Sequence, residues 1–368
     1  MAGSSESKRD PRIDFLRGAA LLTIFVDHVP GNFLATLTVR NFGFSDAAEL
    51  FVLLAGFSAM IAYGRVFEQA GAGMGLRRVG ARCLRIYLFQ VGLLLTTLAI
   101  IQFWISNFGF EPGKIRPMLH GVTGVEHGLV LHALPSSLNI LPLYIVLLAI
   151  FPLLWLGIRR WPAPTLMASA LLWLAANLDP GINLTNWMDG QGWFFNPFAW
   201  QFLFAIGVFC ARVYKEHDQS FPVLPSLWLA CIGYLAFAML AAAPWTNWGF
   251  GSSLFDLDPN KTNLSPLRLI NVLAFAYVLM CLPWFARLVR RRSLQFIVTC
   301  GRHSLEVFAI GTLIALIGRL TFRTFGVTLE TQALVTCLGF GAMIGAALLL
   351  DRPQQVAAAR RALLPGWR

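Results

Sequence analysis

The sequence is poor in charged residues. Only 13% of its 368 residues are Asp, Glu, Lys or Arg, whereas 57% are hydrophobic and the mean hydropathy is +0.64. A water-soluble globular domain carries charge on about a quarter of its residues. The composition therefore excludes an ordinary soluble protein and indicates an integral membrane protein.

Two other features are missing. The six cysteines form no CxxC pair and have no histidine at metal-ligand spacing, which argues against a disulfide or zinc framework and predicts packing roles. They are Cys83, Cys210, Cys231, Cys281, Cys300 and Cys337. The first apolar stretch ends in Asp27, His28 and Pro30 without a small-residue cleavage site. We therefore expect a retained first span and not a removed signal peptide.

Apolar runs separated by polar, Gly or Pro clusters predict about ten membrane spans. They lie near residues 13–29, 47–63, 86–105, 140–158, 166–178, 198–213, 227–243, 267–285, 305–320 and 334–350. Several are shorter than the roughly 20 residues that a perpendicular helix needs, so we expect their ends to extend into the flanks. The predicted fold is all-α and polytopic, with tails at 1–12 and 351–368 around a transmembrane domain at 13–350.

The distribution of basic residues predicts the orientation. With the N-terminus in the cytoplasm, 22 of the 29 Lys and Arg residues fall on the cytoplasmic side and seven on the other. The positive-inside rule then predicts that both termini are cytoplasmic. The net charge of +11 is explained by this topology, and we expect no nucleic acid partner.

The first span carries ionisable residues at both ends. Arg17 and His28 are eleven residues apart, which puts them on one face of a helix, roughly 16 Å apart along its axis, with Leu21 and Ile24 between them on the same stripe. Ionisable residues inside spans usually face the bundle interior and mark a working site. Two simpler roles stay open: Arg17 reaching the interface beside Asp14, and His28 bonded to a loop carbonyl at the interface.

The second span supplies carboxylates. Asp46 and Glu49 have the spacing of an N-cap and its reciprocal partner, which by itself explains Asp46. Glu49 also enters the membrane at nearly the predicted depth of His28. A carboxylate facing an imidazole would hold it in one tautomer for general base catalysis. The candidate catalytic residues are His28, Glu49, Asp46, Asp27 and Arg17.

Longer segments resemble the OpgC family, which belongs with the acyltransferase-3-like membrane acyltransferases. The resemblance begins with RIDFLRGAALLTIFVDHVPGN and LTVRNFGFSDAAELFVLLAGFSAMIAYGR. It continues through LNILPLYIVLLAIFPLL, FNPFAWQFLFAIGVF, LSPLRLINVLAFAYV and GRHSLEVFAIG, and covers about residues 9–350. It implies a ten-span bacterial inner-membrane protein that transfers succinyl groups from succinyl-CoA to osmoregulated periplasmic glucans.

The resemblance also implies roles for residues of the first span. Arg17 and His28 correspond to the Arg and the His of the family's RxxDxxRG-then-His pattern. In this chain Arg12 stands closer to Asp14 than the pattern requires, which leaves the role of Arg12 open.

The expected reaction joins a cytosolic acyl-CoA to a sugar on the other side of the membrane. A pantetheine arm would thread between helices while cytoplasmic arginines bind the CoA phosphates. The candidate CoA-binding residues are Arg302, His303, Arg77, Arg78, Arg82 and Arg85. These arginines are also ordinary topology markers and lipid contacts. His28 would take the proton of a glucan hydroxyl, or form an acyl-histidine intermediate.

Loops on the predicted outer side place aromatic rings beside Asn and Asp side chains. This composition suits sugar recognition, although an interfacial aromatic belt has the same composition. The candidate acceptor-binding residues are Arg40, Asn41, Trp193 and Asn196, with Arg40 also a candidate clamp for an acyl carboxylate.

Two other functions are compatible with the sequence. A glycan or small-acid transporter would also need many spans with buried charges, but neither an internal repeat nor matched broken helices are found. Acetyl transfer to another polysaccharide would use the same chemistry. The expected partners are an acyl-CoA donor, a glucan or other polysaccharide and membrane lipid. We expect no metal ion and no permanently bound cofactor.

Overall fold

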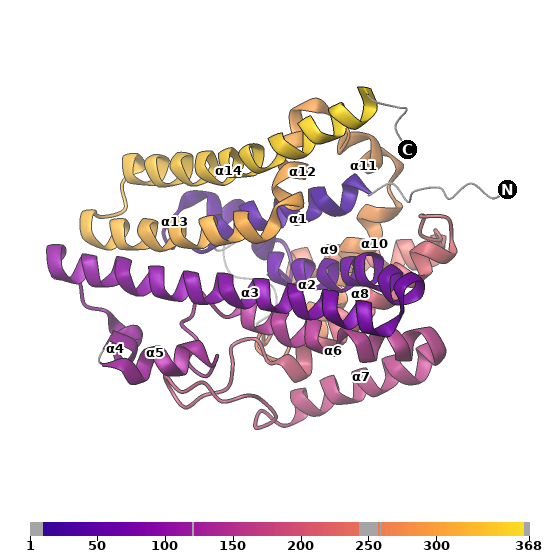
Figure 1. The fold of residues 1–368 in the computed structure, drawn as a ribbon, viewed down its shortest axis with the longest axis horizontal. Coiled ribbons are helices and arrows are strands. Elements are labelled where there is room, and N and C mark those ends of the chain that lie inside the picture. Colours follow the sequence, from indigo (N-terminus) through magenta and orange to yellow (C-terminus); the bar gives the residue numbers. More distant parts are fainter. Residues whose placement is uncertain (1–9, 120, 243–256, 258, 364–368) are drawn as a thin grey trace.

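The computed structural model describes residues 10–119, 121–242, 257 and 259–363, without the side chains of 353–363. Within these ranges the regular secondary structure is helical, apart from an isolated β-bridge between Thr185 and Gly192. The longer helices pack side by side in a bundle (Figure 1). The predicted all-α class is confirmed, whereas most of the predicted N-terminal tail lies outside the described residues.

The predicted apolar runs fall in the longer helices. These are α1 (Pro11–Asp27), α2 (Ala47–Ala59), α3 (Arg65–Phe108), α6 (Ile140–Arg160), α7 (Pro162–Leu178), α8 (Pro197–Glu216), α9 (Pro225–Ala242), α10 (Pro266–Cys281), α13 (Ser304–Phe325) and α14 (Leu329–Leu363). Shorter helices are α4 (Arg116–Leu119), α5 (Val122–Leu129), α11 (Pro283–Leu288) and α12 (Gln295–Arg302). Single turns are η1 (Phe33–Leu37), η2 (Val39–Asn41), η4 (Gly113–Ile115) and η5 (Arg292–Leu294), and η3 (Met60–Gly64) is a π-helical segment.

The helices are long and apolar enough for a multi-pass membrane protein. Among the described residues, six helical segments meet the length and hydropathy of a membrane span. They are Ala47–Phe108, Ile140–Arg160, Pro197–Glu216, Pro225–Ala242, Ser304–Phe325 and Leu329–Arg352. α7 and α10 are apolar but shorter. The number of about ten crossings and the orientation of the chain stay predictions.

The long segment Ala47–Phe108 is interrupted at Gly71. This glycine has a φ of 80°, a left-handed value that side chains other than glycine rarely adopt, and it separates two runs of helix. The segment thereby holds two of the predicted spans, one in α2 and one in α3. The stretch between these two predicted spans is helical on both sides of this glycine.

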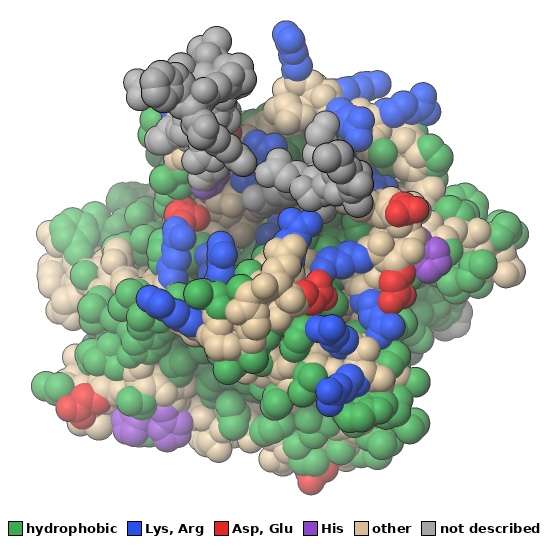
Figure 2. Space-filling model, turned by 45° about the vertical axis from the view of Figure 1, so that its right-hand side comes forward, with side chains coloured by type: hydrophobic (Ala, Val, Ile, Leu, Met, Phe, Trp, Pro, Cys, Tyr) green, Lys and Arg blue, Asp and Glu red, His purple; other side chains and the backbone are tan. Residues whose placement is uncertain are grey.

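Both ends of the described chain lie at the same end of the bundle (Figure 1). Figure 2 brings this end forward and shows many Lys and Arg side chains gathered there. The predicted orientation would place this face in the cytosol.

Glycines allow the helices that carry the site to approach closely. A Cβ added to Gly18 of α1 would lie 1.9 Å from a backbone oxygen of α12, and one added to Gly301 of α12 would lie 1.8 Å from a backbone oxygen of α1. Gly56 of α2 and Gly207 of α8 form an equivalent pair, with distances of 2.1 and 2.2 Å. Small residues at such crossings let membrane helices pack backbone to backbone. These contacts position α1 and α2.

Arg12 has a structural role at the start of α1. Asp10 caps the helix by accepting a hydrogen bond from the backbone nitrogen of Arg12 at 2.9 Å, and its carboxylate pairs with the Arg12 guanidinium at 2.8 Å. Arg12 also donates to the carbonyl of Met280 at 3.1 Å. Arg12 therefore connects the N-terminal start of α1 to α10.

Candidate active site

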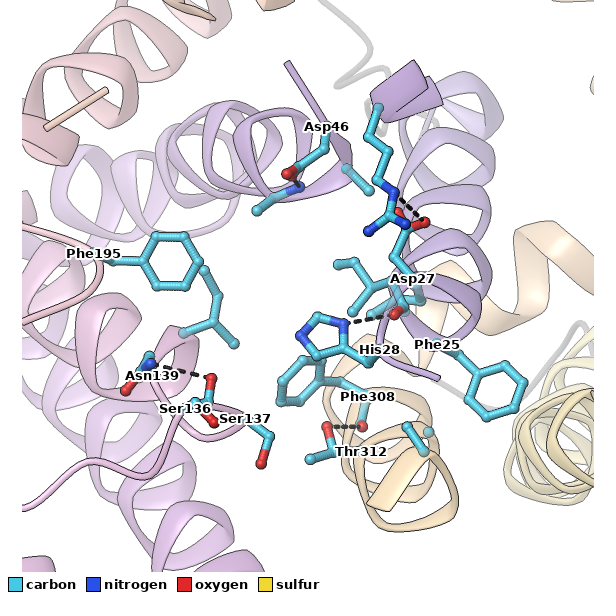
Figure 3. Close-up of a pocket in the computed structure, with 18 of the residues that line it drawn as sticks. Phe25, Asp27, His28, Asp46, Ser136, Ser137, Asn139, Phe195, Phe308 and Thr312 are labelled. Atoms are coloured by element: carbon cyan, nitrogen blue, oxygen red, sulfur yellow. Dashed lines mark hydrogen bonds and ion pairs between the residues drawn. The ribbon is translucent and has the colours of Figure 1, made fainter. Parts of the chain in front are cut away.

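A cavity of about 280 Å³ lies at the C-terminal end of α1 (Figure 3). Its wall combines α1, the start of α2, the segments before α6 and α8, the segment before α10, α13 and α14. The polar or charged residues of the wall are Asp27, His28, Arg40, Asp46, Ser136, Ser137, Asn139, Lys261 and Thr312, and the others are apolar. The structure thus brings predicted residues of the first two spans together with residues far away in the sequence.

The imidazole of His28 projects into this cavity (Figure 3). Its Nδ1 lies 2.7 Å from the carbonyl oxygen of Ile24. Because a carbonyl oxygen only accepts, this bond assigns the proton to Nδ1 of the neutral ring. Nε2 then carries a lone pair and has no hydrogen-bond partner in the described part of the chain. The ring is solvent-accessible, so a substrate hydroxyl in the cavity could meet an available proton acceptor.

The end of α1 explains the position of this ring. α1 ends at Asp27, and His28 is its C-cap. The last carbonyls of a helix have no backbone partner in the next turn, and Pro30 has no N–H with which to extend the ladder. The carbonyl of Ile24, one turn back, accepts from the backbone nitrogen of His28 at 3.1 Å and also from its ring. The orienting partner differs from the one we predicted: it is a backbone carbonyl and not the carboxylate of Glu49 or Asp46.

Asp46 and Glu49 form the capping box that their spacing predicted. The Asp46 carboxylate accepts from the backbone nitrogen of Ala48 at 2.8 Å, and the Glu49 carboxylate accepts from the backbone nitrogen of Asp46 at 2.9 Å. Glu49 is fully buried and lies 2.6 Å from the Arg268 guanidinium. It is not part of the cavity wall. Its contacts indicate that Glu49 anchors the start of α2.

Asp46, unlike Glu49, lies on the cavity wall. Its carboxylate pairs with Lys261 and, at 3.1 Å, with Arg268. Burial alone raises the pKa of the Asp46 carboxyl, but the two cations outweigh burial and hold this pKa well below its usual value. Asp46 is therefore a fixed negative charge in the wall.

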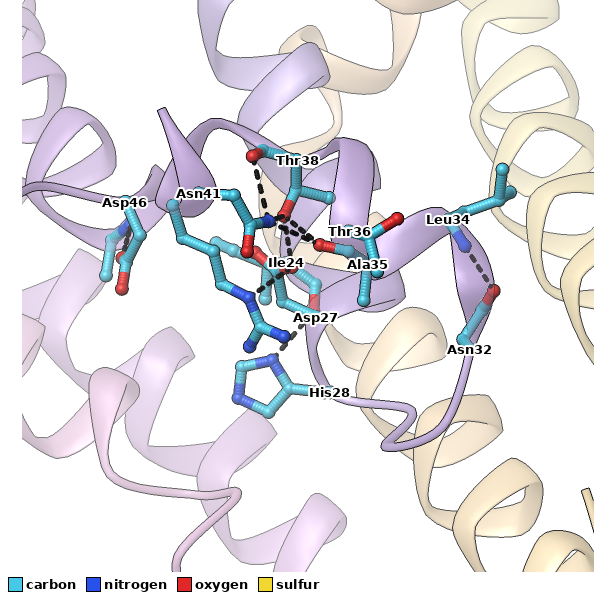
Figure 4. Close-up of polar contacts among 12 residues, drawn as sticks. Ile24, Asp27, His28, Asn32, Leu34, Ala35, Thr36, Thr38, Asn41 and Asp46 are labelled. Carbon is cyan, nitrogen blue, oxygen red and sulfur yellow. Dashed lines mark hydrogen bonds and ion pairs between the residues drawn. The ribbon is translucent and has the colours of Figure 1, made fainter. Parts of the chain in front are cut away.

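Asp27 organises the segment that follows α1 (Figure 4). Its carboxylate accepts a hydrogen bond from the Thr38 hydroxyl at 2.7 Å and lies 3.4 Å from Nε of Arg40. Arg40 lines the cavity, as a substrate-binding role requires. Asn41 does not: its buried amide donates to the carbonyls of Ala35 and Thr38, at 2.6 and 3.2 Å.

Arg17 lies deeper along α1 than the cavity. The cavity wall includes Leu21 and Ile24, the two residues between Arg17 and His28 on the predicted stripe, but not Arg17 itself. Arg17 is buried, and its Nε has no hydrogen-bond partner among the described residues. The expected pairing with Asp14 is not found within the described chain. Asp14 lies instead 3.9 Å from a guanidinium on α12.

The predicted CoA-binding residues gather near the start of α1, away from the cavity. Arg302 lies 3.9 Å from both Asp14 and Asp351, and His303 lies 3.4 Å from Asp351. Arg85 pairs with Glu306. On α3, Arg77 and Arg78 are exposed and Arg82 is half-buried, with no ion pair to any residue that the structure describes. Three of the six residues are thus unpaired, while the others tie α1, α3, α13 and α14 together.

The family model described as "OpgC protein" matches residues 9–355. The chain belongs to the OpgC family. No curated protein and no solved structure matches it. OpgC membership implies an acyltransferase-type enzyme that modifies glucans at a membrane. The resemblance inferred from the sequence is confirmed over nearly the whole chain.

Two predicted acceptor-binding residues of this OpgC protein are structural. Asn196 is buried and caps α8, accepting from the backbone nitrogen of Phe198 at 3.0 Å and donating to the Ile182 carbonyl at 2.6 Å. Trp193 is also buried, and neither residue lines the cavity. The two rings between them, Phe194 and Phe195, do line it. The aromatic loop therefore contributes to the site through different side chains from those predicted.

Sequence reasoning missed several polar residues of the wall. Ser136, Ser137 and Asn139 precede α6 and lie across the cavity from His28 (Figure 3). The two serine hydroxyls make no hydrogen bond within the described residues. Lys261 and Thr312 come from two further segments. The turn-forming run at 135–139 before an apolar stretch is the one local signal that marked any of them.

The donor set does not suit a bound metal ion. In the part of the chain that the structure describes, no group of three or more His, Cys, Asp and Glu side chains could hold one. Within the wall itself, both carboxylates are paired with cations.

Proposed function

We propose that this OpgC protein transfers a succinyl group from cytosolic succinyl-CoA to a hydroxyl group of a periplasmic glucan, in the bacterial inner membrane. The observation that carries the proposal is the imidazole of His28. It is held in one tautomer by Ile24, and it presents Nε2 to a cavity whose wall combines polar and apolar side chains. Family membership supplies the class of reaction.

The proposed step moves one proton and one acyl group. Nε2 of His28 removes the proton of the glucan hydroxyl as its oxygen attacks the carbonyl carbon of the thioester. The carbon–sulfur bond then breaks, and the CoA thiolate takes the proton from the imidazolium. The bond to the Ile24 carbonyl persists in the charged ring, so the ring does not need to turn between the two transfers.

The acceptor sugar would occupy the side of the cavity opposite α1. The hydroxyls of Ser136 and Ser137 have unused donors and acceptors there, and they suit sugar hydroxyls. The rings of Phe194 and Phe195 add an apolar surface on which a sugar face can lie.

The donor would enter from the end of the bundle that carries both chain termini. The exposed guanidiniums of Arg77 and Arg78 are available to the CoA phosphates there, with Arg82 half-buried behind them. Arg302 and His303 would complete the phosphate site near the start of α1. Arg17 lies between this end and the cavity, where it would contact the pantetheine arm.

The test is acyl transfer by the purified protein in proteoliposomes, with labelled succinyl-CoA and periplasmic glucan. We expect His28→Ala to lower transfer by on the order of 100-fold or more, since general base catalysis contributes that much. His217→Ala is a matched control, because the His217 ring bonds to the carbonyl one turn back at 2.9 Å but lies outside the cavity. Normal transfer by folded His28→Ala protein would refute the proposal.

The same assay addresses the acetyl alternative. Labelled acetyl-CoA is offered in a parallel reaction, and preferential transfer of acetyl groups would replace the succinyl donor in this proposal. Label trapped on His28 with donor alone would indicate the two-step route through an acyl-histidine.

A further inference from the structure

The carboxylates around the cavity are all matched by cations. The pairs are Asp27 with Arg40, Asp46 with Lys261, and Glu49 with Arg268. Each of these carboxylates therefore already has a cationic partner within the chain.

Arg319 adds one further positive charge to this region. It is half-buried on α13, yet it makes no hydrogen bond or ion pair with any residue that the structure describes. The other charged group that acts on it is Arg323, which is also positive. A half-buried arginine usually has an anionic partner, because removing its charge from water is costly. Within the described residues, the Arg319 guanidinium is therefore available to an anionic ligand.

The register of α13 directs Arg319 towards the cavity. Phe308, Thr312 and Ala315 line the cavity from this helix. Arg319 follows Ala315 by four residues, which puts it on the same face, about 6 Å further along the axis. The guanidinium thus stands beyond the last cavity-lining turn of α13.

Packing brings Arg319 close to the proposed base. A Cβ added to Gly318 would lie 3.4 Å from Cγ1 of Val29, so α13 touches the chain at the residue that follows His28. The helix register puts Arg319 on the cavity-lining face of α13, and this contact puts the same turn of α13 against the residue that follows His28.

We propose that Arg319 binds the free carboxylate of a dicarboxylic acyl group and so selects succinyl over acetyl donors. This inference rests on the proposed function. Two methylene groups separate the thioester carbonyl of a succinyl group from its carboxylate, so a carbonyl at His28 leaves the carboxylate in reach of a neighbouring cation. A guanidinium matches a carboxylate with two parallel hydrogen bonds. Arg40, the clamp that the sequence suggested, is already paired with Asp27.

The test compares kcat/KM for succinyl-CoA and acetyl-CoA in the reconstituted protein. Losing a charge-assisted bond costs enough to lower kcat/KM for succinyl-CoA by about 10- to 100-fold in Arg319→Gln. We expect little change for acetyl-CoA, and an intermediate loss for Arg319→Lys. Arg323→Gln is the matched control: Arg323 lies one turn further along α13, 5.7 Å from the ring of Phe110, and should keep the wild-type ratio.

Five results would overturn the inference. Equal losses of kcat/KM for both donors would assign Arg319 a packing role, and wild-type kcat/KM for both donors would remove it from recognition altogether. An effect confined to the KM for glucan would mean that Arg319 binds an anionic group of the acceptor. If Arg319→Gln is not recovered folded, Arg319→Lys provides the comparison, and wild-type preference in that variant counts against the inference. Wild-type protein that transfers neither acyl group contradicts the proposed function itself, and this inference with it.

Discussion

The crossing of α1 and α12 makes Gly18 a sensitive test of how the site is positioned. In Gly18→Ala the added Cβ would lie 1.9 Å from the carbonyl oxygen of Ile297, although real Cβ contacts essentially never fall below 3.0 Å. The atom in the way belongs to the backbone, so no side chain can rotate to make room. The two helices must separate by roughly 1 Å. Overpacking of this kind costs about 1–3 kcal/mol, and a backbone clash belongs at the upper end of that range.

The displacement should also reach the reaction. His28 is the C-cap of α1, so a shift of that helix moves Nε2 relative to the residues on the other side of the cavity. A misplacement of about 1 Å can cost on the order of 100-fold in rate. We therefore expect Gly18→Ala to lower both the melting temperature and the succinyl transfer rate.

The assay is thermal unfolding in detergent, followed by transfer in proteoliposomes. Gly345→Ala on α14 is the matched control, because its added Cβ meets no atom within 4 Å. Wild-type melting temperature and wild-type transfer in Gly18→Ala would show that the crossing is not as close as described, and the reasoning would fail.

Two further predictions concern the cavity wall. Because Lys261 and Arg268 hold the pKa of Asp46 below its usual value of 3.8, Asp46 stabilises the fold fully above that value, and its contribution is lost as the pH falls below it. Asp46→Asn should therefore flatten the acid side of a plot of melting temperature against pH; a plot that parallels the wild type would contradict this. Replacing Ser136 and Ser137 together by Ala should raise the KM for glucan by roughly 10-fold and leave the KM for succinyl-CoA unchanged. Equal changes in both constants would show that these hydroxyls do not contact the sugar.

Much of the local structure was predictable because its causes lie within a few residues. The apolar runs correspond to helices, since burying backbone polar groups in an apolar environment requires internal hydrogen bonds. The three-residue spacing of Asp46 and Glu49 was enough to predict their capping box. The eleven-residue interval correctly placed Leu21 and Ile24 on the same stripe as His28, because helical periodicity depends on the backbone and not on the partners.

The incorrect expectations concern residues whose environment is set by segments far away in the sequence. Asn196 and Trp193 occur in a loop whose composition suits sugar binding, but contacts with neighbouring loops bury both of them. Glu49 was expected at the depth of His28. Its carboxylate instead pairs with the guanidinium of Arg268 on α10. Neither outcome is encoded in the immediate sequence, because each depends on which distant segment packs alongside.

By itself, then, the sequence determined the helices, their caps, the family and the histidine at the end of the first span. Only the tertiary structure decided that the histidine is held by Ile24, that serines before α6 lie across from it, and that Arg319 of α13 has no ion pair with any described residue. Helix formation is governed by bonds between near neighbours, which composition and spacing reveal. A cavity is formed by helices that meet after long separations along the chain, and its chemistry depends on the angles and depths at which they pack.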